Sequence, residues 1–249
     1  MSQSLFRLVL LIFVVATRCS LIAQPALAGT AAFNCPPCPT LNHVVLMIGL
    51  PSDDSEARNQ TQLWIAKHSL AAQQLHRQRT GETIPTITKY PANVADFRRD
   101  LQQIAIACMR VEALGIMSHG NIGYLLIGTD GVNEHNLDDV FGHGLGCVMS
   151  PQASIEFAGC NVGRGCRGAD FMRAVADRLL PQGGTVTAPE QYVFGSAILG
   201  IAPRSIWGDR ELQVTRAGSP PRWTRGAEPG PECAVDRAKL NAQGQSSER

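Results

Sequence analysis

Apolar and polar residues fall into blocks along the chain that predict strands followed by helices. A short β-branched run at 44–49 (VVLMIG) predicts a buried strand. The segment 52–79 has apolar residues at helical spacing, acids near its start and basic residues near its end, so it predicts a helix. The run 83–90 predicts a second strand at a sheet edge, because Pro85 within it cannot donate to a strand ladder.

The same alternation continues after residue 90. Helical spacing predicts helices at 93–110, 136–149 and 169–180, and apolar runs predict strands at 112–118, 153–158 and 185–188. Hairpins are predicted at 124–132, with a turn at Asp130-Gly131, and at 201–215, with a turn at Gly208-Asp209. Strands that alternate with helices favour an α/β fold, a three-layer sandwich around a mostly parallel, doubly wound sheet.

The first 28 residues differ from the rest of the chain. Arg7, the apolar run 8–16 and the small residues at 26 and 28 are typical of an export signal peptide. The run is too short to span a bilayer, although an uncleaved anchor is the alternative. The predicted organisation is a signal peptide at 1–28, a Cys/Pro-rich lead at 29–40, an α/β domain at 41–215 and a disordered tail at 216–249. The protein would then be periplasmic, secreted or held at the cell surface.

Composition adds a constraint on the cysteines. The chain has 249 residues, 44% of them apolar, and a formal charge of +1, so no basic field suggests a nucleic-acid partner. Removing the signal peptide with Cys19 leaves cysteines at 35, 38, 108, 147, 160, 166 and 233. In an oxidising compartment one of these stays unpaired, which favours a thiol kept free for chemistry. For Cys35 and Cys38 we expect a structural disulfide, local or to Cys233, rather than a thioredoxin-type redox motif.

Two reactive residues follow consecutive buried strands. His119 ends the strand predicted at 112–118, and Cys160 follows the strand predicted at 153–158. Chemistry in open α/β sheets lies at the carboxyl ends of the strands, so both side chains would project over one edge. Such a pair can perform acyl transfer, with the imidazole managing the proton while the thiolate attacks a carbonyl. The backbone N–H groups of Gly120 and Cys160 are candidate oxyanion donors.

The motifs around these residues resemble a known group of enzymes. "GIMSHG" at 115–120 and "IEFAGC" at 155–160 are similar to the catalytic blocks of the caspase, gingipain and clostripain superfamily of cysteine peptidases, clan CD. Within it, the chain looks closest, over about 44–189, to a caspase-like domain of unknown function in bacterial surface proteins. The resemblance implies a caspase-like cysteine endopeptidase with His119 as catalytic histidine and Cys160 as nucleophile. Gly159 before the cysteine and Asn161 after it depart from the caspase block, and the preferred substrate residue stays open.

The loop after Cys160 allows other interpretations. Its glycines at 163, 165 and 168 spell G-x-G-x-x-G, and Glu190 ends the next strand, as in a dinucleotide site. Four residues separate the strand from this fingerprint, so Asn161, Gly163 and Gly165 are better interpreted, with Asn121, as walls of the thiol site. A further hypothesis is that Cys166 pairs with Cys160 and holds the enzyme inactive until it is reduced.

These patterns together predict an exported caspase-like cysteine endopeptidase that acts on a peptide or protein substrate. We expect no cofactor, no metal site, no nucleic-acid partner and no stable membrane insertion after signal cleavage. A second His-Gly pair, His143-Gly144, is the weaker catalytic candidate, because it does not follow an apolar strand. The alternative function is a catalytically inactive caspase-like binding domain, followed by a thiol redox protein or a dinucleotide-binding protein. Disulfide connectivity and oligomeric state stay open at this point.

Overall fold

The computed structural model describes residues 33–50, 52, 55–191, 193–196, 201–205, 209–214, 222–225 and 233. All of them belong to one folded unit, Ala31–Arg249. The predicted signal peptide at 1–28, the first residues of the predicted lead and most of the predicted tail at 216–249 lie outside the described residues.

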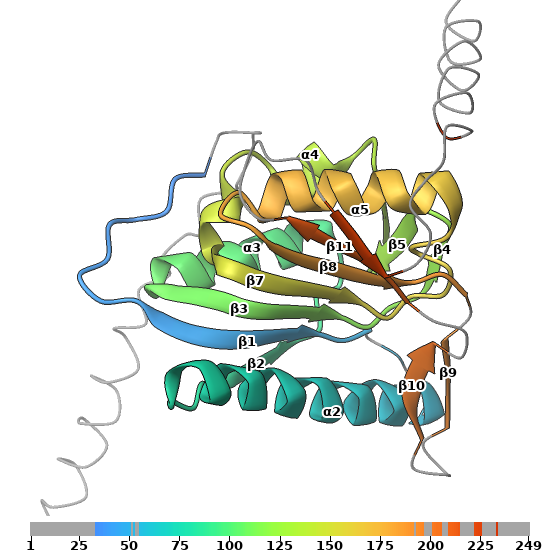
Figure 1. Cartoon of the computed structure of the whole chain (residues 1–249), viewed down its shortest axis with the longest axis horizontal. Coiled ribbons are helices and arrows are strands. Elements are labelled where there is room, and N and C mark those ends of the chain that lie inside the picture. The colour runs from blue at the N-terminus through green and yellow to red at the C-terminus, as the bar shows by residue number, and fades with distance from the viewer. Residues whose placement is uncertain are drawn as a thin grey trace, which may run out of the picture. The chain divides into compact units, whose positions relative to one another are not determined.

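A mixed sheet with the strand order β12-β11-β8-β7-β3-β1-β2 forms the centre of the described structure (Figure 1). Its parallel part consists of β2 (Thr86–Lys89), β1 (Asn42–Ile48), β3 (Met109–Ile116), β7 (Met149–Phe157) and β8 (Gly184–Pro189). Two antiparallel strands continue it, β11 (Asp209–Val214) and β12 (Arg222–Arg225). The predicted α/β class and mostly parallel sheet are confirmed, with β2 at an edge.

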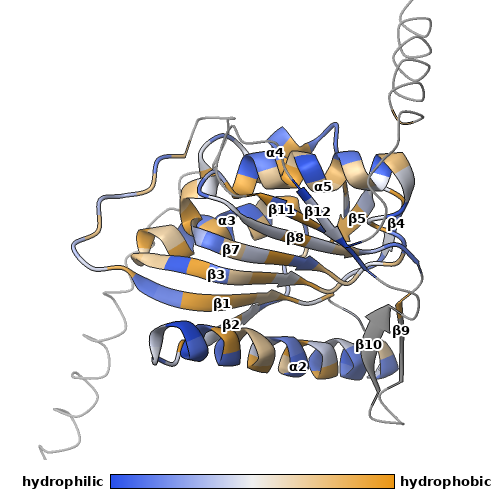
Figure 2. Ribbon diagram, viewed as in Figure 1, coloured by the Kyte–Doolittle hydropathy of each residue, from blue (hydrophilic) through white to orange (hydrophobic). Residues whose placement is uncertain are grey.

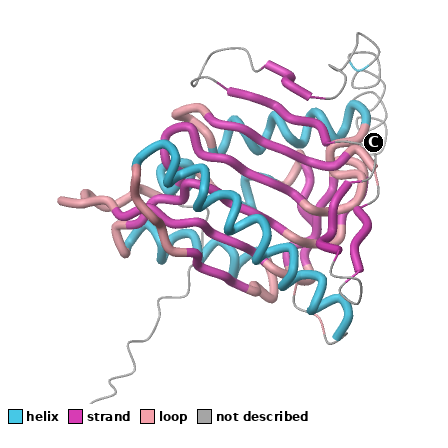
Figure 3. Tube along the Cα trace, turned by 60° about the horizontal axis from the view of Figure 1, so that its bottom comes forward, coloured by secondary structure: helices cyan, strands magenta, loops and turns pink. Residues whose placement is uncertain are grey.

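Helices cover both faces of this sheet. The long helix α2 (Ser55–Thr80) crosses one face, and α3 (Val94–Ile106), α4 (Leu137–Phe141) and α5 (Gly165–Leu179) lie on the other (Figures 1 and 3). The start of α3 is set by Asn93, whose side-chain oxygen accepts a hydrogen bond from the Asp96 N–H.

Buried apolar side chains on both faces of the strands form the core. Figure 2 shows hydrophobic residues along the central strands. Leu46 and Ile48 of β1 are buried on the side of α3 and α5. Val45 and Met47, which point the opposite way, pack with Trp64 of α2. A strand covered by helices on both faces needs apolar residues at every position, which explains the unbroken apolar run in β1.

Short antiparallel sheets lie where the parallel strands end (Figure 1). One consists of β4 (Gly120–Asn121), β5 (Tyr124–Ile127) and β6 (Asp130–Asn133), and the other of β9 (Val193–Ser196) and β10 (Ile201–Ser205). The first begins directly after His119, and the second begins shortly after Glu190. Both therefore flank the carboxyl edge of the central sheet.

The two predicted hairpins differ from the structure. In the first, Asp130 already pairs with Ile127, so the turn lies at Gly128-Thr129, where Gly128 has a φ of 59°, and not at Asp130-Gly131. The second, predicted at 201–215, is wrong. β10 pairs with β9 and β11 pairs with β8, so its two halves belong to different sheets.

The helix predicted at 136–149 is shorter than expected. α4 ends at Phe141, because Gly142 and Gly144 have φ angles of 61° and 95°, outside the helical region. A short 3₁₀ helix, η1 (Leu145–Val148), follows and leads into β7. The Gly-His-Gly-Leu-Gly stretch is therefore a tight connection at the amino end of β7.

Part of the predicted disordered tail is ordered. Strand β12 pairs with β11, and its Trp223 packs on the core, with the guanidinium groups of Arg173 and Arg210 5.5 and 5.3 Å from its ring centroid. Cys233 is buried and bonded to Cys166. For these residues the prediction of disorder is wrong, because one indole and one disulfide anchor a segment of otherwise polar composition.

Disulfides join Cys35 to Cys147, Cys38 to Cys108 and Cys166 to Cys233 within the described residues. The prediction of a local Cys35–Cys38 bond, or of a bond from either to Cys233, is wrong. Cys38 is bonded to Cys108, the residue just before β3. Cys35 is bonded to Cys147 in η1, the 3₁₀ helix that leads into β7. Structural disulfides persist in oxidising compartments, so these three bonds favour such an environment for the protein. None of the helices described here is long and apolar enough to cross a membrane.

Candidate active site

The register of the central sheet places His119 and Cys160 level with each other. β3 and β7 are parallel neighbours, with Ile116 opposite Phe157. The N–H of Ala158 donates to the carbonyl of Ile116 at 2.9 Å, so the pairing continues to the strand ends. His119 and Cys160 each lie three residues beyond the Ile116–Phe157 pair, and their spacing of 41 residues equals the register offset of the two strands.

Gly120 and Gly159 bring the two loops into contact. A Cβ atom on Gly120 would lie 3.0 Å from the Cα of Gly159 and 2.5 Å from a methyl group of Val162. A Cβ atom on Gly159 would in turn lie 3.1 Å from the Cα of Gly120. Backbones approach this closely only where both residues lack a side chain. The glycine after the histidine and the glycine before the cysteine therefore allow the loops that carry the two reactive residues to touch.

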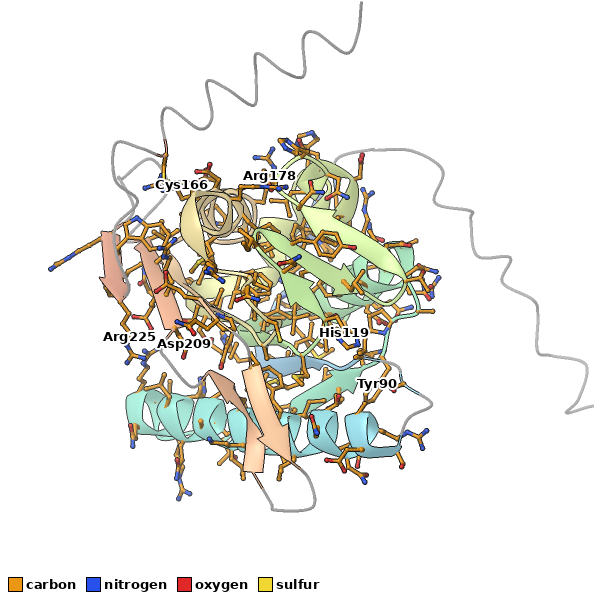
Figure 4. All side chains as sticks on the ribbon, turned by 90° about the vertical axis from the view of Figure 1, so that its right-hand side faces the viewer. Tyr90, His119, Cys166, Arg178, Asp209 and Arg225 are labelled. Atoms are coloured by element: carbon orange, nitrogen blue, oxygen red, sulfur yellow. A yellow bond between two sulfur atoms is a disulfide. The ribbon has the colours of Figure 1, made fainter. Side chains whose placement is uncertain are left out.

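The backbone of His119 is anchored on β5. The N–H of Leu126 donates to the His119 carbonyl at 2.9 Å, and the buried hydroxyl of Ser118 donates to the Leu126 carbonyl. The His119 side chain is exposed at the carboxyl edge, onto which Figure 4 looks. Across that edge, Tyr90, His119 and Asp209 follow the order of their strands β2, β3 and β11. Within the described residues the imidazole makes no hydrogen bond, so it is open to solvent and to an incoming molecule.

The N–H groups of Gly120 and Cys160 are both unpaired within the described residues. Because the Leu126 N–H bonds the His119 carbonyl, Gly120 and Leu125 form the adjoining non-hydrogen-bonded pair of the antiparallel ladder. The N–H of Gly120 therefore points away from β5. Two unpaired N–H groups from touching loops can bind one oxyanion.

Cys160 is the free cysteine among the described residues, and it is partly exposed. The N–H of Val193, at the start of β9, donates to the Cys160 Sγ, with an N–S distance of 3.5 Å. The thiol thus lies at the surface beside a donor, and not in the apolar core.

The turn after Cys160 is fixed to the segment that follows β8. The N–H of Asn161 donates to the Gln191 carbonyl, and the N–H of Gly163 donates to the Pro189 carbonyl, both at 2.9 Å. Asn161 is buried and adopts a left-handed φ of 58°, a conformation that asparagine tolerates better than most residues. Two strand-following segments are therefore joined directly beside the thiol.

The other predicted wall residues differ in their placement. Gly163 packs against β8, since a Cβ atom on it would lie 2.8 Å from the Ala188 carbonyl oxygen. Gly165 begins α5, and within the described structure nothing lies within 4 Å of a Cβ atom built on it. Asn121 is exposed in β4, where its side-chain oxygen accepts from the Ile122 N–H. Asn161 and Gly163 thus lie in the turn beside Cys160, whereas Asn121 follows His119 on the neighbouring loop.

The hypothesis that Cys166 pairs with Cys160 is wrong in this structure. Cys166 lies in the first turn of α5 and is bonded to Cys233, which leaves Cys160 free. The disulfide connects the helix that follows the turn after Cys160 to the C-terminal part of the chain. Cys166 therefore braces this region instead of blocking the thiol.

The sequence patterns did not identify Arg210, whose side chain contacts the end of the turn that follows Cys160. Its guanidinium donates to the Gly165 carbonyl and forms an ion pair with Glu190, each at 2.7 Å. Glu190, which the dinucleotide interpretation needs as a ribose ligand, is therefore engaged by an arginine. The signal that could have identified Arg210 is the alternation of β11, where it occupies an inward position together with Leu212 and Val214.

The second His-Gly pair lies at the other end of the sheet. The carbonyl of His143 accepts from the Phe33 N–H at 2.7 Å, and His143 lines a surface pocket of about 320 Å³ with Asp177 and Arg178. His143 is thus separated by the length of β7 from the edge that carries Cys160.

No group of three or more His, Cys, Asp or Glu residues in the described part of the chain is arranged to hold a metal ion.

Comparison with known proteins identifies one family. No curated protein matches the chain. A family described as "Domain of unknown function (DUF4347)" matches residues 65–200, a stretch that includes β3, β7, His119 and Cys160 and covers more than half of the chain. The protein therefore belongs to the DUF4347 family.

Proposed function

We propose that the protein is a caspase-like cysteine endopeptidase in which His119 and Cys160 form a catalytic dyad. The observation that carries this proposal is the level placement of the two residues past β3 and β7, with Gly120 against Gly159. The unpaired state of Cys160, while the other described cysteines are bonded, adds support.

The proposed reaction is acyl transfer through a thioester. His119 takes the proton from the Cys160 thiol, and the sulfur attacks the carbonyl carbon of a peptide bond. The N–H groups of Gly120 and Cys160 stabilise the oxygen of the tetrahedral intermediate. His119 returns the proton to the leaving amine as the C–N bond breaks, and then takes a proton from water as that water hydrolyses the thioester. The thiol is regenerated and a carboxylic acid leaves.

The proposed location is the periplasm, the cell surface or the exterior. Two observations support it, the disulfides and the signal-like residues at 1–28. An oxidising compartment leaves a free thiol exposed to oxidation, so an unpaired Cys160 there is better explained by use than by accident.

One observation favours a second function, a catalytically inactive binding domain. Within the described residues no hydrogen bond joins the His119 imidazole to Cys160, and the sulfur instead accepts from the Val193 N–H. A domain that retains the fold and binds peptides without cleaving them would show the same features.

A thiol-directed peptidyl electrophile library separates the two functions. We expect intact-mass spectrometry to find one label on Cys160 of the wild type, and none on the Cys160→Ala variant. His119→Ala should slow labelling by about 10²–10⁴-fold, the contribution of a general acid–base residue. His143→Ala, at the other His-Gly pair, is the matched control and should label like the wild type. Absence of labelling, or labelling that neither the Cys160 nor the His119 substitution changes, would contradict the peptidase proposal.

A further inference from the structure

Arg210 departs from the pattern of its strand. The inward positions of β11 are Arg210, Leu212 and Val214, with exposed fractions of 4%, 0% and 6%. Inward positions beneath a helix normally carry apolar residues, and a fully buried arginine is rare. The charged residue occupies the inward position closest to the carboxyl edge, where β11 pairs with the last residues of β8.

The Arg210 guanidinium bridges the two segments on either side of the turn that follows Cys160. One terminal nitrogen donates to the carbonyl of Gly165, the first residue of α5, and the other pairs with the Glu190 carboxylate just after β8, each at 2.7 Å. The residues on either side of Glu190, Pro189 and Gln191, accept the N–H groups of Gly163 and Asn161. Two kinds of contact thus hold the turn, backbone hydrogen bonds to Pro189 and Gln191 and the side chain of Arg210.

This arrangement closes a ring that begins next to the nucleophile. It runs from Asn161 along the turn to Gly165, through Arg210 to Glu190, and back through Gln191 to Asn161. Movement of the turn away from β8 would break the ring. Cys160 directly precedes Asn161, so the direction of its N–H depends on the position of the turn.

Fold stability does not account for an arginine at this position. A buried ion pair is often replaced by apolar residues without loss of stability, because desolvation of the charges offsets their attraction. The Nε of Arg210 is buried and has no hydrogen-bond acceptor within the described residues, which adds to that cost. A leucine would continue the apolar pattern of Leu212 and Val214. A charged residue at a normally apolar position, kept at a cost in stability, is expected at functional sites.

We propose that Arg210 is a positioning residue that holds the turn after Cys160, and with it the oxyanion donor, in the geometry for acyl transfer. The inference rests on the proposed function and deepens it, because it makes the C-terminal strands β11 and β12 part of the catalytic unit. Trp223 of β12 supports the guanidinium from its ring face.

The test compares Arg210→Leu with the wild type in the full chain, using a peptidyl electrophile from the library. We expect the maximal inactivation rate, kinact, to fall about 100-fold, the loss that a misplacement of about 1 Å produces, while KI changes little. The urea midpoint should fall, because Glu190 loses its partner, so kinact is measured on protein shown to be folded. Arg178→Leu is the matched control, since Arg178 forms a bidentate pair with Asp138 away from the thiol, and its kinact should be unchanged.

Hydrogen exchange gives a second readout that needs no catalysis. In Arg210→Leu the amides of 161–165 should exchange about tenfold faster, because the loss of one bridging interaction weakens the hydrogen bonds of the turn. If the wild type does not label at all, the proposed function fails, and the exchange rates still show whether Arg210 holds the turn. Wild-type exchange and wild-type kinact in Arg210→Leu would overturn the inference.

Arg210→Lys decides the matter if the leucine variant does not fold. Lysine keeps the charge but cannot span Gly165 and Glu190 with a planar fork. We expect it to fold and to show a lowered kinact. A folded Arg210→Lys variant with wild-type kinact and wild-type exchange at 161–165 would overturn the inference as well. A residue with only a structural role would shift the urea midpoint and leave kinact unchanged.

Discussion

The two ends of the central sheet carry the same residue types, an exposed histidine next to a glycine and a cysteine, but differ in the state of the cysteine. At the amino end, the backbone of His143-Gly144 contacts Phe33, and Cys147 is bonded to Cys35. At the carboxyl end, His119 is exposed and Cys160 is free. A histidine next to a glycine, or a cysteine near a strand end, therefore does not identify a site. What distinguishes the carboxyl end, within the described residues, is that its cysteine is free while the backbone around it is fixed.

The means of fixing the chain also differ between the ends. Two disulfides, from Cys35 and Cys38, tie the lead to the amino end. The turn after Cys160 is instead held by backbone hydrogen bonds and by Arg210, and its only disulfide within the described residues lies at its far end, at Cys166 in the first turn of α5. Bonds of this kind position a loop without consuming the thiol that the loop carries.

The largest expected effect comes from adding one methyl group at the carboxyl end. Gly120→Ala places a Cβ atom against the Gly159 backbone and a methyl group of the buried Val162, so the two loops must separate. We expect Cys160 labelling by the peptidyl electrophile to slow about a thousandfold, comparable with loss of the acid–base residue. Rates measured by intact-mass spectrometry on protein shown to be folded by circular dichroism provide the check.

Gly144→Ala is the matched substitution at the amino end. Its φ is 95°, and a Cβ atom there would collide with the Phe33 carbonyl oxygen, so we expect a loss of stability. Labelling of Cys160 in the folded fraction should be unchanged. Equal slowing of labelling by both alanine variants would contradict the distinction between the two ends.

The second prediction uses two disulfides that span similar lengths of chain. Cys38–Cys108 spans 70 residues and lies at the amino end, and Cys166–Cys233 spans 67 residues and lies near the thiol. Replacing either pair by alanine should lower the free energy of unfolding by about 2–4 kcal/mol, because both bonds restrict the unfolded chain to a similar degree. Urea denaturation provides the measurement.

Only one of these pairs should affect the thiol. Cys166 lies at the start of the helix that follows the turn after Cys160, so its release should slow Cys160 labelling, whereas release of Cys38 from Cys108 should not. Faster labelling without the Cys166–Cys233 bond would show that this disulfide restrains the site instead of bracing it. An unchanged rate would show that the hydrogen bonds suffice.

Much of this arrangement could be predicted from local patterns. The apolar run at 44–49 and the strand–helix alternation predict the parallel sheet, and the strand-end positions of His119 and Cys160 predict a shared edge. These inferences succeed because a strand buried on both faces has a distinctive composition and because parallel strands end at one edge.

The contacts between distant segments could not be predicted in this way. Cys38 meets Cys108 only because β1 and β3 become neighbours, and spacing along the chain carries no trace of that. The expected Cys166–Cys160 pair failed for a related reason, since the disulfide partner, Cys233, lies in a segment whose polar composition indicated disorder. Arg210 was missed because its partners, Gly165 and Glu190, come from two other elements.

The smallest expected effect concerns an ion pair away from the thiol. The Arg178 guanidinium donates to both oxygens of Asp138, at 2.7 and 3.0 Å, and this hydrogen bonding lowers the pKa of Asp138 and raises the pKa of Arg178. A carboxylate with a depressed pKa stabilises the fold above its unfolded pKa of about 3.9, and the contribution disappears as the pH falls through the lower folded value. Asp138 is exposed, so the stabilisation is small. Urea midpoints of the wild type and Asp138→Asn should therefore differ slightly at pH 7, and the difference should start to shrink as the pH falls below about 4. A difference that persists into acid would show that Asp138 contributes through packing and not through its charge.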